Sequence, residues 1–254
     1  MLLSGKKGLV LSVTNESSIG WAVAKLAYDH GAVVGVGAQN ERNGERLARL
    51  LETAPNMRMH IADFQNEDLL AKLAEEVAAT YGKLDFIVHS AAFAHKEDLQ
   101  GRFIDTSRAG FGTALDISAY SLVRLCRLLE PLLNDDASIL TMSYLGSTRV
   151  VANYNVMGVA KAALEASVRY LAQDLGVRGI RVNTVSPGPI NTVAARGIKG
   201  LTEMIDYVGE RAPLRRPANQ AEVAGTSLYL LSDLSRGVTG QVIYVDSGYN
   251  FVGV

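Results

Sequence analysis

The chain has little cysteine, little net charge and no long apolar run, and each shortage excludes a class of protein. Its 254 residues include one cysteine, Cys126, so no disulfide can form within the chain and a reducing, cytoplasmic compartment is expected. The 25 Lys and Arg against 26 Asp and Glu leave a net charge of −1, which disfavours nucleic acid and anionic lipid as partners. The longest uncharged run, Val182–Ala195, contains Pro187 and falls short of the ~20 apolar residues that span a bilayer. The N-terminal stretch also lacks the length and cleavage site of a secretory signal, so the start is expected to belong to the mature protein.

What the sequence does have is a regular alternation of short apolar, β-branched runs with longer segments of helical period. This alternation predicts repeated β-α units and a parallel sheet, and the length suits one doubly wound Rossmann domain of α/β class over residues 1–254. The seven strands are expected at Gly8–Val13, Val33–Gly37, Met57–Ile61, Leu84–His89, Ser138–Met142, Arg181–Ser186 and Gln241–Val245. The helices are expected at Ile19–His30, Glu41–Glu52, Glu67–Tyr81, Phe111–Leu133, Asn153–Leu175 and Glu222–Leu231.

The loop after the first strand, from Ser12 to Gly20, is the expected site for a pyrophosphate. Ligands of such sheets bind beyond the carboxyl ends of the strands, and glycines there allow a tight turn onto a helix N-terminus. Gly20 fits this pattern, but Ser12 stands where a first glycine is usual. By itself the loop equally suits a helix capped by Ser17 or Ser18 without a ligand.

Residues after the next strands suggest how the rest of a dinucleotide would bind. Gln39 offers an amide to a ribose hydroxyl and favours NADH, whereas Arg42, three positions on, keeps NADPH open. Asp63 could accept the adenine amino group and Phe64 could cover the ring, although Asp63 also suits an ordinary turn. His89, at a strand end, is interpreted as a structural histidine and not as a base.

Tyr154 and Lys161 form the candidate catalytic pair. Seven residues make about two helical turns, so both side chains would project from nearly the same face. A nearby cation would help a phenol to donate a hydrogen bond to a developing oxyanion, and the same ammonium could hold ribose hydroxyls. The alternative is a core tyrosine and an unrelated surface lysine.

Motifs along nearly the whole chain carry a family resemblance. They include Leu3–Lys6, Ser18-Ile19, Gln39-Asn40, Val88–Ser90, Phe93-Ala94, Ser143–Gly146, Asn153–Met157, Ala160-Lys161, Gly188–Ile190 and Val245-Asp246. With these motifs the chain resembles the enoyl-acyl-carrier-protein reductases of bacterial type II fatty acid synthesis, a divergent branch of the short-chain dehydrogenases/reductases. That superfamily usually spaces its pair as Tyr-x3-Lys. Here Gly158 stands at that lysine position, which makes the longer spacing a discriminating feature.

The resemblance implies reduction of the trans-2 double bond of an enoyl thioester by hydride from NADH, with NADPH not excluded. It implies that Tyr154 hydrogen-bonds the thioester oxygen, that Lys161 holds the nicotinamide ribose and that Tyr144 shapes the thioester pocket. Ala94 matches a position near the substrate. The positions that match cofactor contacts are Ser12, Ser18, Ile19, Gln39, Asp63, Phe64, Ala91, Lys161, Ile190, Asn191, Thr192, Val193 and Ala194. No metal is implied.

The resemblance also implies an acyl carrier protein as partner, a homotetramer, and a substrate-binding lid at about residues 190–208. A local basic patch formed by Arg196, Lys199, Arg215 and Arg216 could meet the acidic carrier, and the apolar tail from Gly248 onward suits a subunit contact.

Two other functions remain open. One is a carbonyl or 3-oxoacyl thioester reductase of the wider superfamily, with Ser143 as its catalytic serine, although Gly158 argues against it. The other is a non-catalytic nicotinamide-sensing protein on the same fold, which would tend to lose the tyrosine or the lysine. Both are present here.

Overall fold

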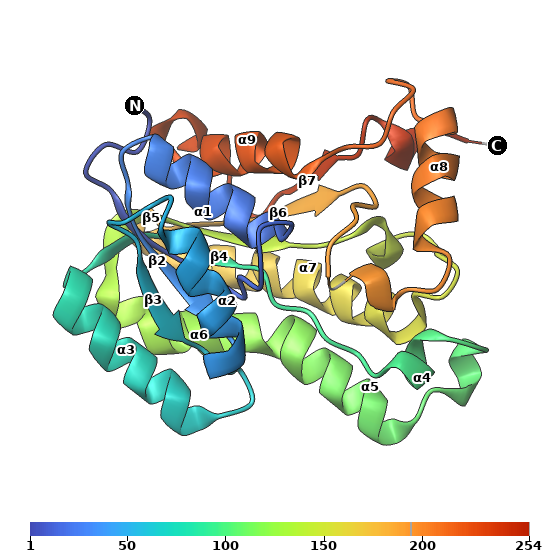
Figure 1. The fold of residues 1–254 in the computed structure, drawn as a ribbon, viewed down its shortest axis with the longest axis horizontal. Coiled ribbons are helices and arrows are strands. Elements are labelled where there is room, and N and C mark those ends of the chain that lie inside the picture. Colours follow the sequence, from blue (N-terminus) through green and yellow to red (C-terminus); the bar gives the residue numbers. More distant parts are fainter. Residues whose placement is uncertain (194, 254) are drawn as a thin grey trace.

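The computed structural model describes residues 1–193 and 195–253 and has a parallel seven-stranded sheet at its centre (Figure 1). The strand order is β3-β2-β1-β4-β5-β6-β7, and every neighbouring pair runs parallel. The order reverses between β1 and β4, as in a doubly wound Rossmann sheet. The predicted fold class is therefore confirmed.

All seven predicted strands are present; the ends of β4 are as predicted, and the other six strands differ at one end or both. Their bounds are β1 (Lys7–Leu11), β2 (Val33–Ala38), β3 (Arg58–Ile61), β4 (Leu84–His89), β5 (Leu133–Met142), β6 (Arg181–Pro187) and β7 (Val242–Val245). The β5 strand begins five residues before the predicted Ser138, and its register against β4 shifts between Leu84 and Phe86.

Most of the helices also lie where the apolar period predicts them. Their bounds are α1 (Ile19–Asp29), α2 (Glu41–Leu51), α3 (Glu67–Tyr81), α4 (Lys96–Leu99), α5 (Arg108–Leu115), α6 (Ser121–Leu129), α7 (Asn155–Leu175), α8 (Leu201–Arg211) and α9 (Gln220–Leu231). The sequence interpretation missed the short α4. It gave the region of α8 only as part of a lid.

The single helix predicted at Phe111–Leu133 is wrong. The structure divides this stretch into α5, a π-helical turn η2 (Asp116–Tyr120), α6 and a short 3₁₀ turn before β5. Two serines, one within the π-helical turn and one directly after it, form hydrogen bonds with residues at the end of β4 and in the loop that follows β4. The Ser118 hydroxyl donates to the carbonyl oxygen of Phe93 at 3.1 Å, and the Ser121 hydroxyl lies 2.8 Å from His89 Nε2. Such turns are frequent at functional sites, and this one brings Ile117 to the cavity described below.

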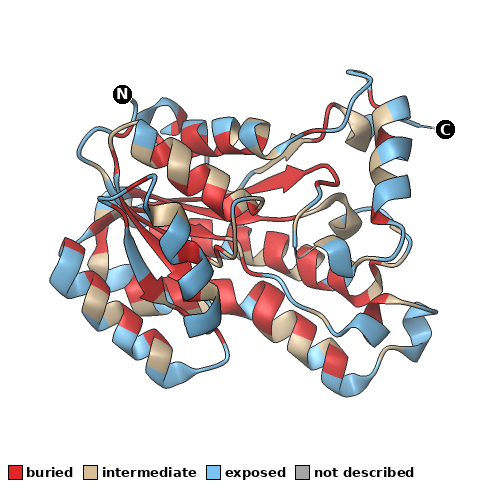
Figure 2. Ribbon diagram, viewed as in Figure 1, coloured by how far each residue is buried: buried red, intermediate tan, exposed pale blue. Residues whose placement is uncertain are grey.

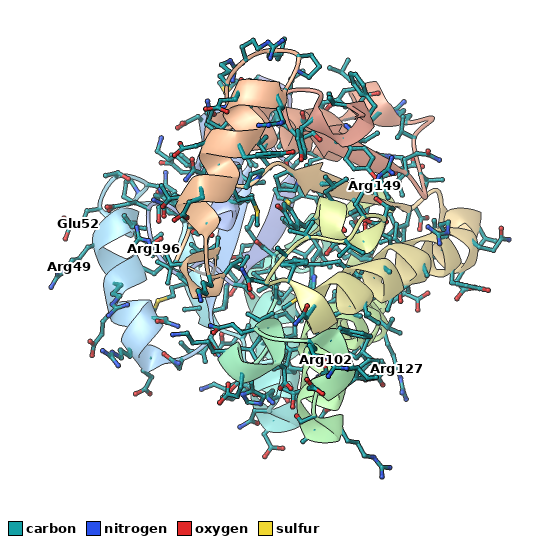
Figure 3. The ribbon with its side chains drawn as sticks, turned by 90° about the vertical axis from the view of Figure 1, so that its right-hand side faces the viewer. Arg49, Glu52, Arg102, Arg127, Arg149 and Arg196 are labelled. Carbon is teal, nitrogen blue, oxygen red and sulfur yellow. The ribbon has the colours of Figure 1, made fainter. Side chains whose placement is uncertain are left out.

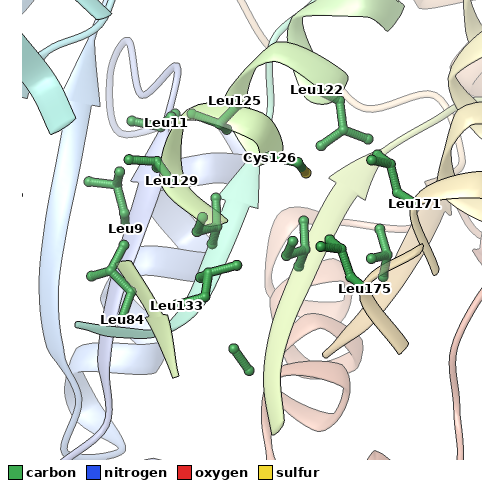
Figure 4. Packing of buried hydrophobic residues seen from close by; sticks show 14 of the residues in the cluster. Leu9, Leu11, Leu84, Leu122, Leu125, Cys126, Leu129, Leu133, Leu171 and Leu175 are labelled. Carbon is green, nitrogen blue, oxygen red and sulfur yellow. The ribbon is translucent and has the colours of Figure 1, made fainter. Parts of the chain in front are cut away.

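Apolar side chains cover both faces of the sheet (Figure 2). One face packs against α3, α6 and α7, where Leu125, Leu129 and Leu175 are buried (Figure 4). The other face packs against α1, α2 and α9. Burial on both faces explains why the strands are near-continuous apolar runs. In the described part of the chain, every helix is too short or too polar to cross a membrane.

Candidate active site

A cavity of about 610 Å³ lies along the carboxyl ends of the strands. Residues that follow each of β1 to β6 line it, which is where a doubly wound sheet binds ligands. The α8 helix stands at its far end, beside the C-terminal segment (Figure 1).

The loop after β1 retains the backbone of a glycine turn although it lacks the glycine. Ser12 has φ +64°, in the left-handed region that glycine favours. Ser18 caps α1, its hydroxyl oxygen accepting a hydrogen bond from the Trp21 N–H at 3.3 Å. A Cβ at Gly20 would lie 3.3 Å from Val13, so this glycine lets the helix approach β1 closely. Of the two serines considered as caps, Ser17 and Ser18, the structure has Ser18 in this role. The loop also opens onto the cavity through Ser12, Ser18 and Ile19.

Gln39, Asp63 and Phe64 line the same end of the cavity. Phe64 is buried and packs edge-to-face on His89, with ring centroids 5.2 Å apart. The guanidinium of Arg124, on α6, donates to the Phe64 carbonyl oxygen and so holds this turn in place. Arg42 is exposed and does not line the cavity.

Tyr154 lies at the other end of the cavity, immediately before α7. The helix was predicted to include Tyr154 but begins at Asn155, so the tyrosine is its N-cap residue. Its ring meets that of Tyr144 edge-to-face with centroids 4.9 Å apart. Burial, followed by the neighbouring Tyr144, raises the pKa of Tyr154 well above its usual range. The phenol therefore stays protonated at neutral pH.

Lys161 is buried in α7 and reaches the cavity two turns after Tyr154. Its Nζ donates to the Met142 carbonyl oxygen at the end of β5, at 2.7 Å. Burial lowers the pKa of Lys161 to about 8, and the nearby Glu165 carboxylate partly offsets this effect. Glu165 itself accepts a hydrogen bond from the Ser143 hydroxyl. Two successive turns of α7 thus hold Met142 and Ser143, directly before Tyr144.

His89 is a structural histidine, as predicted. It is fully buried, with Nδ1 2.9 Å from Thr141 Oγ1 and Nε2 2.8 Å from Ser121 Oγ. Burial, followed by the charge of Lys161, lowers the pKa of His89 to about 3. The ring is neutral near pH 7 and both nitrogens are engaged, so it cannot serve as a base.

Two glycines allow α7 to approach the loop after β5. A Cβ at Gly146 would lie 2.4 Å from the Tyr154 ring, and a Cβ at Gly158 would lie 2.7 Å from the Gly146 carbonyl oxygen. A lysine at position 158, as Tyr-x3-Lys spacing would require, therefore does not fit this packing.

The structure brings most of the predicted site residues together. Those that line the cavity are Ser12, Ser18, Ile19, Gln39, Asp63, Phe64, Ala91, Ala94, Tyr144, Tyr154, Lys161, Ile190, Thr192 and Val193. Asn191 instead lines a separate small depression, and its Oδ1 accepts a hydrogen bond from Arg196 Nε at 3.1 Å. Ala194 lies outside the described residues.

Sequence reasoning missed several cavity residues. Ile117 reaches the cavity from the π-helical turn, Met157 from the first turn of α7 and Met204 from α8. The position of Met157, one turn after Tyr154 on a predicted helix, was a usable signal. Nothing in the local sequence indicates the placement of Ile117.

A cavity of about 610 Å³ at the switch point of a Rossmann sheet, with a buried tyrosine and lysine at one end, is typical of a nicotinamide-dependent oxidoreductase of the short-chain dehydrogenase type. The family model described as "Enoyl-(Acyl carrier protein) reductase" matches residues 13–250. The chain belongs to this family, so the predicted family is confirmed.

Individual relatives agree over almost the full length. The NADH-type enoyl-[acyl-carrier-protein] reductase FabI of Nostoc sp. is 45% identical, over 99% of both chains. The enoyl-acyl carrier protein reductase of Anaplasma phagocytophilum, solved in complex with NAD, is 42% identical with a TM-score of 0.96, covering 100% of this chain and 97% of that one. The Bacillus cereus enzyme, solved with NADP⁺ and an indole naphthyridinone, is 44% identical with a TM-score of 0.97, covering 100% and 99%.

Proposed function

We propose that this protein reduces the trans-2 double bond of enoyl thioesters carried on acyl carrier protein, using NADH, in fatty acid elongation. Family membership supports the reaction. The observation that carries it in the structure is the Tyr154–Lys161 pair at one end of the cavity, with Gly158 packed too tightly to be replaced by a lysine.

The residues of the cavity fit a nicotinamide dinucleotide. The left-handed Ser12, the capped N-terminus of α1 and the amide of Gln39 suit the phosphates and a ribose, while Ala91 leaves room for a flat ring. Lys161 would hold the second ribose. When bound, the reduced cofactor supplies the hydride. No arginine contributes to the described cavity lining, which supports NADH over NADPH because a 2′-phosphate usually meets an arginine.

Tyr154 is proposed as the donor to the thioester oxygen. Addition of hydride at the β-carbon places negative charge on that oxygen, and a buried donor stabilises the enolate more strongly than water does. The raised pKa of Tyr154 keeps its proton available. Tyr144, whose ring contacts that of Tyr154, would shape the thioester pocket, and Ala94, which lines the cavity, would lie beside the substrate.

The 190–208 segment is proposed as the lid of the substrate site. Ile198, Leu201 and Met204 line the cavity, and the Tyr144 hydroxyl lies 3.0 Å from the Met204 sulfur. The α8 helix packs against the C-terminal residues, where the ring of Tyr207 on α8 meets the ring of Tyr249 edge-to-face. Closure over the acyl chain would exclude water from the reacting atoms. Unchanged protease cleavage within 190–208 on adding NADH and an unreactive substrate analogue would contradict this role.

The acyl carrier protein is expected to dock beside this lid. Arg196 and Lys199 are exposed there. Figure 3 looks onto this end of the molecule and shows Arg196 at the left, well apart from Arg149 and Arg102. Arg216 is paired with Glu222 at 2.5 Å, so the basic patch centres on Arg196 and Lys199.

We also propose a homotetramer in the cytoplasm. The edge strand β7 is only half-buried, and Phe251 in the tail is 71% exposed, so apolar surface is available for a subunit contact. The last tail residue, Val254, lies outside the described residues. The buried thiol of Cys126 is consistent with a reducing compartment.

The test is NADH oxidation, followed by absorbance, with crotonyl and longer 2-enoyl thioesters. We expect turnover with each enoyl substrate and a lower kcat/KM with NADPH than with NADH. Turnover of 3-oxoacyl thioesters without turnover of any enoyl thioester would contradict the proposal and favour the carbonyl reductase alternative. Binding of NADH without turnover of either substrate class would favour the sensor.

A further inference from the structure

Two asparagines flank Tyr154, and both have unusual backbone conformations. Asn153 has φ +59° and Asn155 has φ +34°, in the left-handed region that residues other than glycine rarely adopt. Asparagine tolerates this region better than most residues, and such outliers concentrate at functional sites. Both backbone outliers thus lie directly beside the proposed catalytic tyrosine.

The side-chain amides of the two asparagines reach in different directions. Asn153 Nδ2 donates to the Lys199 carbonyl oxygen at 2.9 Å, and Asn155 Nδ2 donates to the Gly101 carbonyl oxygen at 3.2 Å. Both acceptors lie at left-handed glycines, because Gly101 has φ +77° and Lys199 directly precedes Gly200, which has φ +80°. Each side-chain amide therefore donates to a backbone carbonyl oxygen at a turn of a neighbouring segment.

The two segments held in this way both line the cavity. We name residues 195–204 the α8 segment and residues 96–105 the α4 segment. Ile198, Leu201 and Met204 reach the cavity from the α8 segment, and Lys96 and Leu99 from the α4 segment. Figure 1 shows α8 and α4 at the same end of the molecule, on either side of the start of α7.

We propose that Asn153 and Asn155 are positioning residues that latch the α8 and α4 segments to the backbone on either side of Tyr154. A shift of either segment then acts directly on the residue next to the tyrosine, and the width of the acyl-chain entrance is coupled to the placement of the phenol. The latch needs the amide donor as well as the left-handed backbone. Its catalytic consequence rests on the proposed function, but its effect on the resting protein does not.

Replacement by glycine separates the amide from the backbone. Asn153→Gly and Asn155→Gly keep the left-handed conformation accessible and remove the donor, whereas the aspartate variants keep the shape and replace the donor by an acceptor. Asp136→Gly is the matched control, because Asp136 has φ +62° at the start of β5 and does not line the cavity.

The first readout is hydrogen–deuterium exchange of the full-length protein without cofactor or substrate. We expect Asn153→Gly and Asn153→Asp to speed exchange in residues 198–204 at least threefold and to leave residues 101–106 unchanged. Asn155→Gly and Asn155→Asp should do the reverse, and Asp136→Gly should change neither. Exchange within error of the parent protein in these segments, or a rise throughout the sheet, would overturn the latch.

The second readout is the split between KM and kcat. We expect the Asn153 variants to raise KM for a dodecenoyl thioester about three- to tenfold, with a smaller change for a crotonyl thioester. We also expect kcat to fall at least threefold for both substrates, because the phenol beside Asn153 is no longer held in place. Equal changes in KM for both chain lengths would overturn the coupling to the acyl-chain entrance. An inactive parent protein would count against the proposed function, while the exchange experiment would still decide the latch.

Discussion

Tyr154 is the residue on which the proposed chemistry depends most. Its raised pKa and its position at the cavity make it a protonated donor that water does not replace easily. We expect Tyr154→Phe to lower kcat for crotonyl thioester about 100- to 1,000-fold, since loss of one oxyanion donor costs ~2.7–4 kcal/mol in the transition state. Unchanged NADH binding would show that the site is intact. A kcat within threefold of the parent enzyme would mean that another group donates to the oxygen.

Lys161 gives a prediction for the dependence of activity on pH. Its pKa is lowered to about 8, so the ammonium form predominates below that pH and is lost above it. If the charged form is needed to hold the ribose, kcat/KM should be level up to about one pH unit below this pKa, fall to half at the pKa and approach a tenfold fall per pH unit above it, because kcat/KM reports groups of the free enzyme.

The matched variant for this profile is Lys161→Met. It should have a low kcat/KM without the fall near pH 8, since the titrating group is gone. The same fall in this variant would assign the titration to another group.

The close approach of α7 to the loop after β5 is tested at Gly158. Alanine normally stabilises a helix interior relative to glycine by ~0.5–1 kcal/mol. At Gly158 the new Cβ would lie 2.7 Å from the Gly146 carbonyl oxygen, so we expect Gly158→Ala to lower the free energy of unfolding by ~1–3 kcal/mol.

Gly225 in α9 is the control, because a Cβ there would have no heavy atom within 4 Å. Gly225→Ala should raise the free energy of unfolding by ~0.5–1 kcal/mol in the same urea titrations. An equal rise in the free energy of unfolding for Gly158→Ala and Gly225→Ala would contradict the tight packing of α7 against the loop after β5.

The predictability of the elements differs for physical reasons. Most of the strands follow from short apolar runs that are bounded by turn residues, because both faces of the central sheet are buried. The start of β5 gave no such signal, because Asn134, Asp135 and Asp136 are polar. The α8 helix also had a signal, since Leu201, Met204 and Val208 follow a helical apolar period. The π-helical turn had none, because it depends on hydrogen bonds that Ser118 and Ser121 form with Phe93 and His89, which lie far from the turn in the sequence.

The same distinction holds for the site. Ser12, Gln39 and Asp63 could be predicted because the carboxyl ends of parallel strands meet at one edge. The left-handed Asn153 and Asn155 could not, since their conformations depend on segments far along the chain. The direction in which the pKa of Tyr154 shifts could not be predicted either. The sequence suggested help from a nearby lysine, whereas burial and Tyr144 are what shift this phenol.

On the scale of the whole molecule, His89 makes folding sensitive to acid. The lowered pKa of about 3 means that the folded protein leaves this ring neutral where the unfolded chain, with a pKa of ~6.5, protonates it. The free energy of unfolding should therefore fall as pH falls from ~6.5 toward 3, by up to ~1.4 kcal/mol per pH unit from this group.

Comparison of His89→Asn with the parent protein isolates this contribution. The variant should be less stable at pH 7, because it loses buried hydrogen bonds, but its stability should decline less steeply toward acid. If the free energy of unfolding falls equally with pH in the two proteins, the acid sensitivity does not come from His89.

The central claim is that the cavity, which extends from the Ser12 turn to Tyr154, holds NADH and an enoyl thioester so that the cofactor transfers hydride to the β-carbon of the thioester. The most direct measurement uses NADH dideuterated at C4 with crotonyl thioester, followed by mass spectrometry and NMR of the product. We expect the saturated butyryl thioester with one deuterium at C3. Absence of saturated product, or saturated product without deuterium at C3, would contradict the account.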